Sequence, residues 1–355
     1  MSQSENLFWK KKEFVSFLLS FLIFFIHASS FSQYPGTGSV VSLINEKASF
    51  FLQESITRFA VPLYFILSGI AFFKGYDNSK YVGKIKSRVF TLVIPYLLWN
   101  TIWMLFNIVC SYTFLSQYFV GREVFSITPI NVLKGIFFYG CNLPFWFVFN
   151  LIVFSAAAPL VYLVVRNKHV GIAAIVALTV LANFDIGLPV VVFHASTSIV
   201  YYLIGALIGQ HYFDLVTKPS AKWMQRASAA FLAVYIALKN VFADHTYPCK
   251  ILLQVVVFVL ASFAFWNVTD MFIHRVKPRK LYARSFAIYA LHSNVAAIIT
   301  KLIVLCFPKS EWMAIPNFIA TIILTVLTIH VACTLLEKFL PKVYAVLMGN
   351  RLKRT

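Results

Sequence analysis

Charged residues are scarce in this sequence: Asp, Glu, Lys and Arg together account for 12% of its 355 residues. A soluble domain carries about 25% charged residues, so this chain has about half the charge that it would need to cover a globule. Long apolar stretches recur along the whole chain, each close to the ~20 residues that cross a bilayer core. The shortage of charge therefore argues against an ordinary soluble domain and predicts a single membrane domain.

Acidic residues are scarcer than basic ones. The sequence has 12 Asp and Glu residues against 31 Lys and Arg, which leaves a formal net charge of +19. An excess of this size can indicate nucleic-acid binding, but that function needs the basic residues gathered on one face. Here they lie in short loops between apolar runs, where they set membrane topology and face anionic lipid headgroups. We expect the lipid bilayer, and no nucleic acid, as a partner.

The cysteines show no metal-binding spacing, and we predict no metal site. A disulfide and buried free thiols both remain open for the four cysteines near the outer ends of the predicted spans, which are Cys110, Cys141, Cys249 and Cys306. No internal repeat is evident, which weighs against the inverted-repeat design of many transporters.

The apolar runs predict an all-α fold, a polytopic integral membrane bundle of about ten transmembrane helices. A cytoplasmic segment over residues 1–13 and a basic cytoplasmic tail over residues 341–355 are expected to flank a transmembrane domain over residues 14–340. The fifth and seventh spans are short for a bilayer crossing. The ten spans are expected at roughly 14–34, 51–73, 89–111, 144–165, 170–187, 193–213, 228–243, 250–269, 285–306 and 313–337.

The distribution of basic residues predicts the orientation. With the N-terminus inside, 23 of the 31 Lys and Arg residues fall in inner segments and 8 lie outside or at outer helix ends. Because cytoplasmic loops are enriched in Lys and Arg, we expect both termini in the cytoplasm and the protein in the cytoplasmic (plasma) membrane. In the longest outer loop, an apolar stretch at 132–139 is too short to span, so it predicts an interfacial or re-entrant helix.

A histidine lies deep in the first predicted span. His27 follows Lys12 by fifteen residues, or about 22 Å along a helix, which places it in the outer half of the membrane. An ionisable side chain at that depth is costly and indicates function. Histidine can act as a general base or a nucleophile near neutral pH. A neutral histidine that only bonds a neighbouring helix remains the alternative.

The next two spans carry further polar groups. The second runs from Arg58 to Ser68 and the glycine after it, where small residues allow close helix approach and the hydroxyl lies within the bundle. Arg58 could stabilise charge near the site or only extend to the membrane surface. Basic residues before the third span, Lys84, Lys86 and Arg88, could bind phosphate groups or serve only as positive-inside signals.

Aromatic and histidine side chains mark the later spans. Trp146 opens the fourth span, where it could also be an interfacial anchor. In the ninth span, Tyr289 and His292 form an intramembrane polar pair that could be functional or a structural hydrogen bond. His194 begins the sixth span at the outer surface, where it would face headgroups or water.

In order and spacing, these motifs resemble those of the acyltransferase-3 family of membrane O-acyltransferases over most of the chain. The family opens with an acidic residue, a basic residue three positions later, ten more residues and a histidine. Here that register reads Glu13, Ser16 and His27, so a serine replaces the basic residue, and Lys12 one turn earlier is the candidate substitute. The later matches are the Arg58 to Ser68 run, the Lys84 to Arg88 segment before Ile-Pro-Tyr, the Pro-Phe-Trp146-Phe segment, and Phe286-x-x-Tyr289-x-x-His292.

The resemblance implies transfer of an acyl group, most often acetyl, from cytoplasmic acyl-CoA (acetyl-CoA) to a hydroxyl of an extracytoplasmic acceptor such as a cell-surface polysaccharide. The catalytic candidates that it implies are His27, Glu13, Arg58 and Ser68. The candidates for the CoA phosphates are Lys84, Lys86 and Arg88, and a second polar site would contain Trp146, Tyr289 and His292.

Two other functions remain open. A transporter or flippase of an envelope precursor would use paired broken helices and several midplane charges. A catalytically degenerate family member, kept as a partner subunit, would be consistent with Ser16 in place of a basic residue. If His27 is catalytic, Glu54 and Asp185 are the acidic residues near the outer half of the membrane that could orient it.

Overall fold

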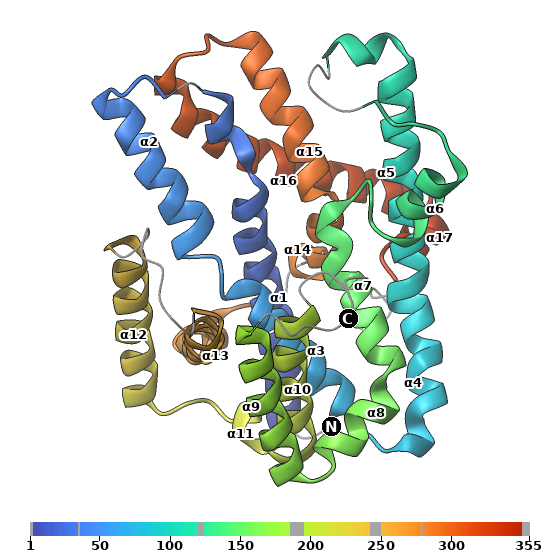
Figure 1. Ribbon diagram of the computed structural model, residues 1–355, viewed down its shortest axis with the longest axis vertical. Helices are drawn as coiled ribbons and strands as arrows, with labels where there is room; N and C mark the ends of the chain where they lie inside the picture. Colours follow the sequence, from blue (N-terminus) through green and yellow to red (C-terminus); the bar gives the residue numbers. More distant parts are fainter. Residues whose placement is uncertain are drawn as a thin grey trace.

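The computed structural model is built from helices packed side by side, and no strand occurs among the residues that it describes (Figure 1). It describes residues 3–34, 36–118, 124–184, 195–241, 250–277 and 280–349. In Figure 1, α1 (Gln3–His27) rises through the middle of the bundle toward α2 (Val40–Phe50) at the upper left. The all-α fold is therefore confirmed.

The helices follow the predicted apolar runs closely. After α2, a π-helical turn over Phe51–Ser55 leads into α3 (Ala60–Phe73). The remaining long helices are α5 (Ile94–Tyr112), α10 (Ala195–His211), α12 (Lys222–Val241), α13 (Lys250–Thr269), α15 (Ser285–Cys306) and α16 (Ala314–Phe339). The shorter ones are α4 (Tyr81–Arg88), α6 (Pro129–Phe137), α7 (Trp146–Ala156), α8 (Ala158–Val165), α9 (Lys168–Asn183), α11 (Phe213–Thr217), α14 (Lys280–Ala283) and α17 (Pro341–Leu347).

Fewer helices are long and apolar enough to span a membrane than the ten that were predicted. Each predicted span contains a helix, but only six of the described helical segments are long and apolar enough to cross a membrane, or seven if a bent pair counts as one span. The shortfall has a physical cause: α9 and α10 have 16 and 17 residues, and α12 carries three Lys or Arg residues. The six are Gln3–Gln33, Val40–Phe73, Asn78–Tyr112, Lys250–Thr269, Ser285–Cys306 and Glu311–Phe339.

The bent pair is the predicted fourth span. Helices α7 and α8 meet at Ala157 with a bend of 69°. Pro159 occupies the first turn of α8, where a residue without an N–H is tolerated because no intrahelical bond is lost. The proline thus starts a new helix instead of lying within a straight one.

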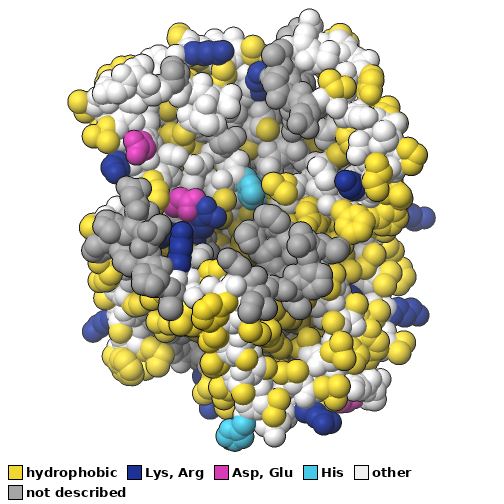
Figure 2. Space-filling view, in the orientation of Figure 1, with side chains coloured by type: hydrophobic (Ala, Val, Ile, Leu, Met, Phe, Trp, Pro, Cys, Tyr) yellow, Lys and Arg dark blue, Asp and Glu magenta, His cyan; other side chains and the backbone are white. Residues whose placement is uncertain are grey.

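Apolar side chains face outward on the membrane helices, and this indicates a bilayer setting. On α16, five apolar residues four positions apart are each about half exposed: Ile319, Ile323, Leu327, Val331 and Leu335. Figure 2 shows hydrophobic side chains over much of one face, with few charged side chains, some of which gather beside a histidine near its middle. A stripe of this kind would be unfavourable in water and is expected against lipid tails. The protein is therefore an integral membrane protein.

Helix α6 forms in the loop between α5 and α7, where a short helix was predicted. It packs on α5, and its last-turn carbonyls accept hydrogen bonds from that helix: Tyr96 Oη donates to Phe137 O (2.8 Å) and Asn100 Nδ2 donates to Ile136 O (3.1 Å). Gly135 faces Met104 at the crossing. Whether this helix lies at the interface or re-enters the membrane stays a prediction.

Glycines bring α3 and α10 into backbone contact. A Cβ at Gly69 would collide with the Tyr202 carbonyl, and one at Gly205 would collide with the Ile66 carbonyl. Gly209, one turn after Gly205, has the same role, since its Cβ would lie 2.7 Å from Ile70 O. Small residues at four-residue spacing are the usual means of close helix approach in membranes. The crossing holds α3, and with it Ser68, at a fixed position.

Replacing Gly205 with alanine is expected to destabilise the protein by about 1–3 kcal/mol, because the added methyl group has backbone on its other side and forces the helices apart. Thermal unfolding of the detergent-solubilised protein, followed by size-exclusion chromatography, measures the effect. Gly83→Ala in α4 is the matched control, since no atom lies within 4 Å of a Cβ there. Equal melting temperatures for the two variants would contradict the close crossing.

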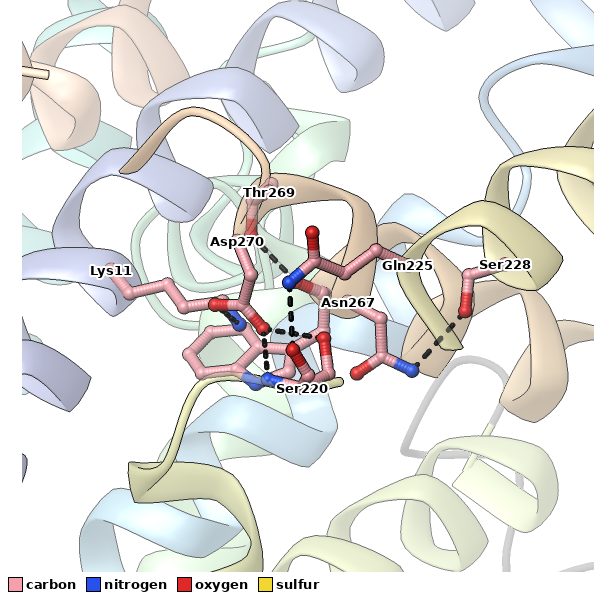
Figure 3. Close-up of polar contacts among 8 residues, drawn as sticks. Lys11, Ser220, Gln225, Ser228, Asn267, Thr269 and Asp270 are labelled. Carbon is pink, nitrogen blue, oxygen red and sulfur yellow. Dashed lines mark hydrogen bonds and ion pairs between the residues drawn. The ribbon is translucent and has the colours of Figure 1, made fainter. Parts of the chain in front are cut away.

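A buried ion pair fixes the beginning of α1. Lys11 Nζ lies 2.6 Å from Asp270 Oδ1, and the two side chains are 3% and 2% exposed. Lys11 also lies over the Trp266 ring, 4.1 Å from its centroid. Asp270 Oδ2 accepts hydrogen bonds from the backbone N (2.9 Å) and hydroxyl (2.8 Å) of Ser220. Figure 3 shows the Asp270 carboxylate between Lys11 and Ser220, so one acidic group joins α1, the end of α13 and the segment before α12.

Candidate active site

His27 lies beside a second histidine. It is the last residue of α1, and its ring centroid is 5.3 Å from that of His292 on α15. The two rings are inclined by 51°. Helix α1 packs along α15, and Phe24, one turn before His27, also contacts the His292 ring at 5.8 Å. The structure thus joins a residue predicted as catalytic with one predicted for a separate polar site.

The protonation of His292 follows from its hydrogen bonds. The side chain is fully buried, and its Nδ1 lies 2.7 Å from Tyr289 O and 3.2 Å from Ile288 O. Because carbonyl oxygens only accept hydrogen bonds, Nδ1 carries the proton and Nε2 holds a lone pair. Within the described part of the chain, Nε2 is buried and has no hydrogen-bond partner. An acceptor without a donor is rare in a protein interior, so this atom is available to a donor beside it.

Arg58 lies within electrostatic reach of His27. Its guanidinium pairs with Glu54 one turn earlier, in the π-helical turn before α3. The ammonium of Lys239 on α12 donates to the Glu54 carbonyl at 2.8 Å. Glu54 was one of two carboxylates proposed to orient His27; its carboxylate instead binds Arg58. The other, Asp185, lies outside the described residues, as does His194.

A cavity of about 890 Å³ extends alongside α1. Its walls come from α1, α3, α7, α15 and the segment around the end of α4. His27 is not among its lining residues, but Tyr289 is, and the Tyr289 ring centroid is 6.0 Å from that of His292. Five residues from four separate sequence motifs meet on this cavity: Glu13, Ser16, Ser68, Arg88 and Tyr289.

Three cations also line the cavity: Lys12, Lys74 and Arg88. Lys74 pairs with Glu5 at 2.5 Å. The predicted phosphate-binding triad is therefore divided. Arg88 faces the cavity, whereas the Lys84 ammonium donates to the Phe72 carbonyl and Lys86 is exposed to the surroundings. Which cation reaches the cavity depends on the side of α4 from which each side chain projects. A run of basic residues in the sequence does not specify that side.

The segment joining α3 to α4 is held by an aspartate. Asp77 accepts hydrogen bonds from the backbone N (3.0 Å) and the hydroxyl of Ser79, and it pairs with Lys80 at 3.0 Å. These hydrogen bonds, from Ser79 first and Lys80 second, lower the pKa of Asp77 to about 2. The carboxylate therefore remains ionised over any ordinary working pH, and its contacts with Ser79 and Lys80 in the segment between α3 and α4 are retained in mild acid.

Aromatic stacking positions Tyr289. Its ring is parallel to that of Phe145 at 5.7 Å, and its hydroxyl donates to the Pro144 carbonyl at the start of α7. Trp146 follows two residues later and packs on Phe65 (6.1 Å between centroids). Tyr289 thus links the cavity wall to His292, and Trp146 supports α3 from the side.

Two residues that join three helices at the cavity were not singled out in the sequence. Ser20 Oγ lies 2.8 Å from Tyr64 Oη and 3.2 Å from Ser285 O, and the Tyr64 hydroxyl donates to the Ser16 carbonyl. These contacts connect α1, α3 and the first residue of α15. They could have been found from the sequence because hydroxyl groups are rare in apolar runs, and those present often form hydrogen bonds between membrane helices.

A second, outer cavity of about 620 Å³ lies beyond the end of α1. It is enclosed by the last turn of α1, the segment after it, α2 and the π-helical turn. Gln53 lines it and donates through Nε2 to Ala28 O at 2.7 Å, directly after His27. The histidine pair therefore lies between two cavities, one along α1 and one past its end. Among the described residues, no group of three His, Cys, Asp or Glu could hold a metal ion.

Comparison with known families adds one finding. A family model described as an acyltransferase domain, Acyl_transf_3, matches residues 15–337. The match begins at Val15 in α1, two residues after Glu13, extends to the last turn of α16 and includes both histidines. No curated protein and no solved structure matches the chain.

Proposed function

We propose, since the chain belongs to the acyltransferase-3 family, that this membrane acyltransferase is an O-acyltransferase working across the cytoplasmic membrane. It transfers an acyl group, in the first instance acetyl, from cytoplasmic acyl-CoA (acetyl-CoA) to a hydroxyl of an extracytoplasmic acceptor such as a cell-surface polysaccharide. Both termini lie in the cytoplasm in this proposal. Membership in the family supports acyl transfer; the donor and the acceptor are what the resemblance implies, and the orientation is inferred from the distribution of Lys and Arg.

One observation carries the proposal: a cavity with cations at its wall extends to Tyr289, whose ring contacts His292 of the histidine pair. Lys12, Lys74 and Arg88 supply positive charge for phosphate groups, and the walls near Leu67 and Leu151 are apolar. Its volume of about 890 Å³ falls within the range of ligand sites. A donor with an anionic head and a long thioester arm fits such a site, and the arm would pass Tyr289 to reach the histidines.

Acyl transfer then needs a base and a route for one proton. In one form, His27 takes the proton from the acceptor hydroxyl while its oxygen attacks the thioester carbonyl, and the proton passes to the departing CoA thiolate. In the other, a His27 nitrogen attacks the thioester and the thiolate leaves. The acceptor hydroxyl oxygen then attacks the acyl carbon, the imidazole leaves, and the hydroxyl proton passes to the CoA thiolate. Both yield an ester and free CoA. The nearby Arg58 guanidinium can stabilise the negative charge on the carbonyl oxygen.

His292 orients His27 in this proposal. Its Nε2 lone pair accepts an N–H from His27, which leaves the other His27 nitrogen unprotonated and aimed at the substrates. Support comes from the buried, unpartnered Nε2 and the ring separation of 5.3 Å. The role corresponds to that of the carboxylate that fixes the histidine tautomer in hydrolase triads. A neutral partner suits a site from which water is excluded, because a buried carboxylate there would need further compensation.

Purified protein in liposomes, supplied with labelled acetyl-CoA on one side and oligosaccharides on the other, tests the function. We expect labelled acetyl esters on the oligosaccharide and release of CoA thiol in equal amounts. Movement of unmodified oligosaccharide across the bilayer, without ester formation, would instead indicate a transporter or flippase. CoA release without acetylated product would show donor hydrolysis only and would contradict the transfer reaction.

Replacing Arg88 with glutamine is expected to raise the KM for acetyl-CoA about tenfold to a hundredfold, because one charge-assisted hydrogen bond to phosphate is worth about 1.5–3 kcal/mol. The kcat should change little, since the charge lies away from the reacting atoms. Steady-state kinetics at varied acetyl-CoA concentration measure both constants. Lys86→Gln is the matched control, because Lys86 is exposed on the same helix and does not line the cavity. Equal KM values for the two variants would contradict phosphate binding at Arg88.

The role of His292 is tested by two substitutions that retain different nitrogens. Asparagine keeps a donor near the Nδ1 position but has nothing at Nε2, whereas glutamine places an amide near Nε2. We expect His292→Asn to lower kcat about a hundredfold through misorientation of His27, and His292→Gln to retain more activity. The pH dependence of kcat should shift only in His292→Asn, which removes the hydrogen-bond acceptor at the Nε2 position. Equal losses and an unchanged pH profile in both variants would indicate a purely structural histidine.

A further inference from the structure

The outer cavity lies next to the residues that come directly before and directly after His27 in the sequence. Ile26, one residue before His27, lines this cavity of about 620 Å³. Gln53, on its wall, holds Ala28 by a 2.7 Å hydrogen bond, one residue after His27. A molecule in this cavity would therefore approach His27 from the side opposite to the cation-lined cavity along α1.

The lining has the chemistry of a site for hydroxyl-rich molecules. Ser42, Asn45 and Ser49 on α2 supply hydroxyl and amide groups, which both donate and accept hydrogen bonds. Gln53 Oε1 accepts from Ser49 at 2.8 Å, so its amide is held in one orientation. The aromatic rings of Phe31, Tyr34 and Phe50 add flat apolar surface beside these groups. A volume near 620 Å³ is within the range of small-molecule sites.

The charges on this cavity are acidic. Glu46 and Glu54 line it, and none of its described lining residues is Lys, Arg or His. Glu54 is paired with Arg58, whereas Glu46 is exposed on α2. A carboxylate at the wall repels a second carboxylate or a phosphate and accepts hydrogen bonds from hydroxyl groups. The cavity along α1 has the opposite character, since Lys12, Lys74 and Arg88 line it.

We propose that the outer cavity binds the acyl acceptor and that the bound part is an uncharged, polyhydroxylated molecule of the sugar class. This inference rests on the proposed acyl transfer and adds where the acceptor binds and which acceptors are excluded. Acidic walls outside and basic walls along α1 sort the two substrates by charge, so that an anionic thioester donor and a neutral acceptor meet at His27 from opposite sides.

Direct binding tests the cavity without any acyl transfer. Full-length protein in lipid nanodiscs is titrated with three neutral trisaccharides (maltotriose, cellotriose and chitotriose) and with trigalacturonate as the anionic probe. We expect at least one neutral trisaccharide to bind, and trigalacturonate to bind about tenfold or more weakly than it. Stronger binding of trigalacturonate, or no binding of any neutral probe, would overturn the assignment.

Paired variants on α2 locate the binding site. Phe50→Ala should weaken binding of the neutral probe about fivefold to tenfold through loss of ring contact, whereas Phe51→Ala should not, because Phe51 is 41% exposed and does not line the cavity. Glu46→Lys should strengthen trigalacturonate binding relative to the neutral probe, and Lys47→Gln, a charge change one residue away, should leave the ratio unchanged. Equal effects within either pair would contradict binding in this cavity.

The kinetic form of the experiment separates failure of the inference from failure of the proposed function. In the transfer assay, Phe50→Ala should raise the KM for the acceptor and leave the KM for acetyl-CoA unchanged. Ordinary transfer with an unaltered acceptor KM would overturn the acceptor site and retain the enzyme. Binding that follows the variants as predicted, with no transfer by the unmodified protein, would retain the cavity as a sugar site and overturn acyl transfer.

Discussion

Replacing His27 with alanine is expected to lower the rate of acyl transfer by a factor of about 10³ or more. A positioned general base alone contributes about 10²–10⁴, and loss of the side chain also leaves the His292 Nε2 without its proposed donor. The KM values for both substrates should change little, because neither cavity counts His27 among its lining residues. Transfer of labelled acetyl groups by equal amounts of purified protein measures the loss.

The control for this substitution is His169→Ala. His169 is exposed in the first turn of α9, where its backbone N–H is capped by Asn167 and its ring has no role in the packing of the bundle. We expect full activity from this variant. Wild-type activity in His27→Ala, with protein levels and melting temperature unchanged, would show that the histidine pair is structural and would remove the basis of the proposed mechanism.

The same assay can distinguish the two roles of His27. If the imidazole carries the acyl group, rapid quenching in the absence of acceptor should trap one labelled acetyl group per protein, and mass spectrometry should locate it on the peptide that contains His27. If His27 is only a base, no label should be trapped while transfer proceeds normally. The His292→Asn variant should reduce trapping in the first case, because the attacking nitrogen loses its orientation.

The helical fold could be predicted from the sequence because apolar run length is a local property. The helices over Gln3–His27, Lys250–Thr269 and Ser285–Cys306 lie close to where the runs placed them. The number of spans could not be predicted in this way, because α9 is short for a bilayer crossing and α12 is polar for one. The 69° bend at Ala157 also escaped prediction, since a proline in the first turn of a helix and a proline within one look alike in sequence.

The candidate site was predicted in pieces. Ser68 and Tyr289 could be found because a polar residue in an apolar run is costly, whereas Glu13 was found through the register that resembles the family's. Their convergence on one cavity depends on tertiary packing, which no spacing specifies. The contact of His27 with His292 joins residues 265 positions apart, and the two cavities that flank them are made by side chains that are individually ordinary.

Rotation about the helix axis was the other missing quantity. Lys10, Lys11 and Lys12 are equivalent in a sequence count of inner charges, but each residue turns the helix by 100°. Lys12 therefore lines the cavity along α1, whereas Lys11 is 2% exposed and faces α13. All three count as inner charges in the sequence, and Lys12 is also the candidate substitute at the Ser16 position, but only the structure shows that Lys11 is paired with Asp270.

Breaking this pair is expected to cost about 3–5 kcal/mol of stability, because removal of one partner leaves a buried charge uncompensated. In Lys11→Met the Asp270 carboxylate keeps two hydrogen bonds from Ser220 but loses its counter-charge. In Asp270→Asn the Lys11 ammonium keeps its contact with the Trp266 ring but loses its counter-charge. Both single variants should show a lower melting temperature and lower membrane levels. Lys10→Met is the control and should behave like the unmodified protein.

The double variant decides between a charge effect and a packing effect. Lys11→Met with Asp270→Asn removes both charges, and the asparagine can still accept the hydrogen bonds from Ser220. If the single losses come from unpaired charge, the double variant should regain most of the melting temperature, since replacing a whole buried pair is often close to neutral. Additive losses would instead show that the contacts of each side chain, with Trp266 on one side and Ser220 on the other, carry the stability. Because Lys11 and the cavity residues Lys12 and Glu13 share one helix, a double variant that folds but transfers slowly would further show that the ion pair sets the position of α1 for catalysis.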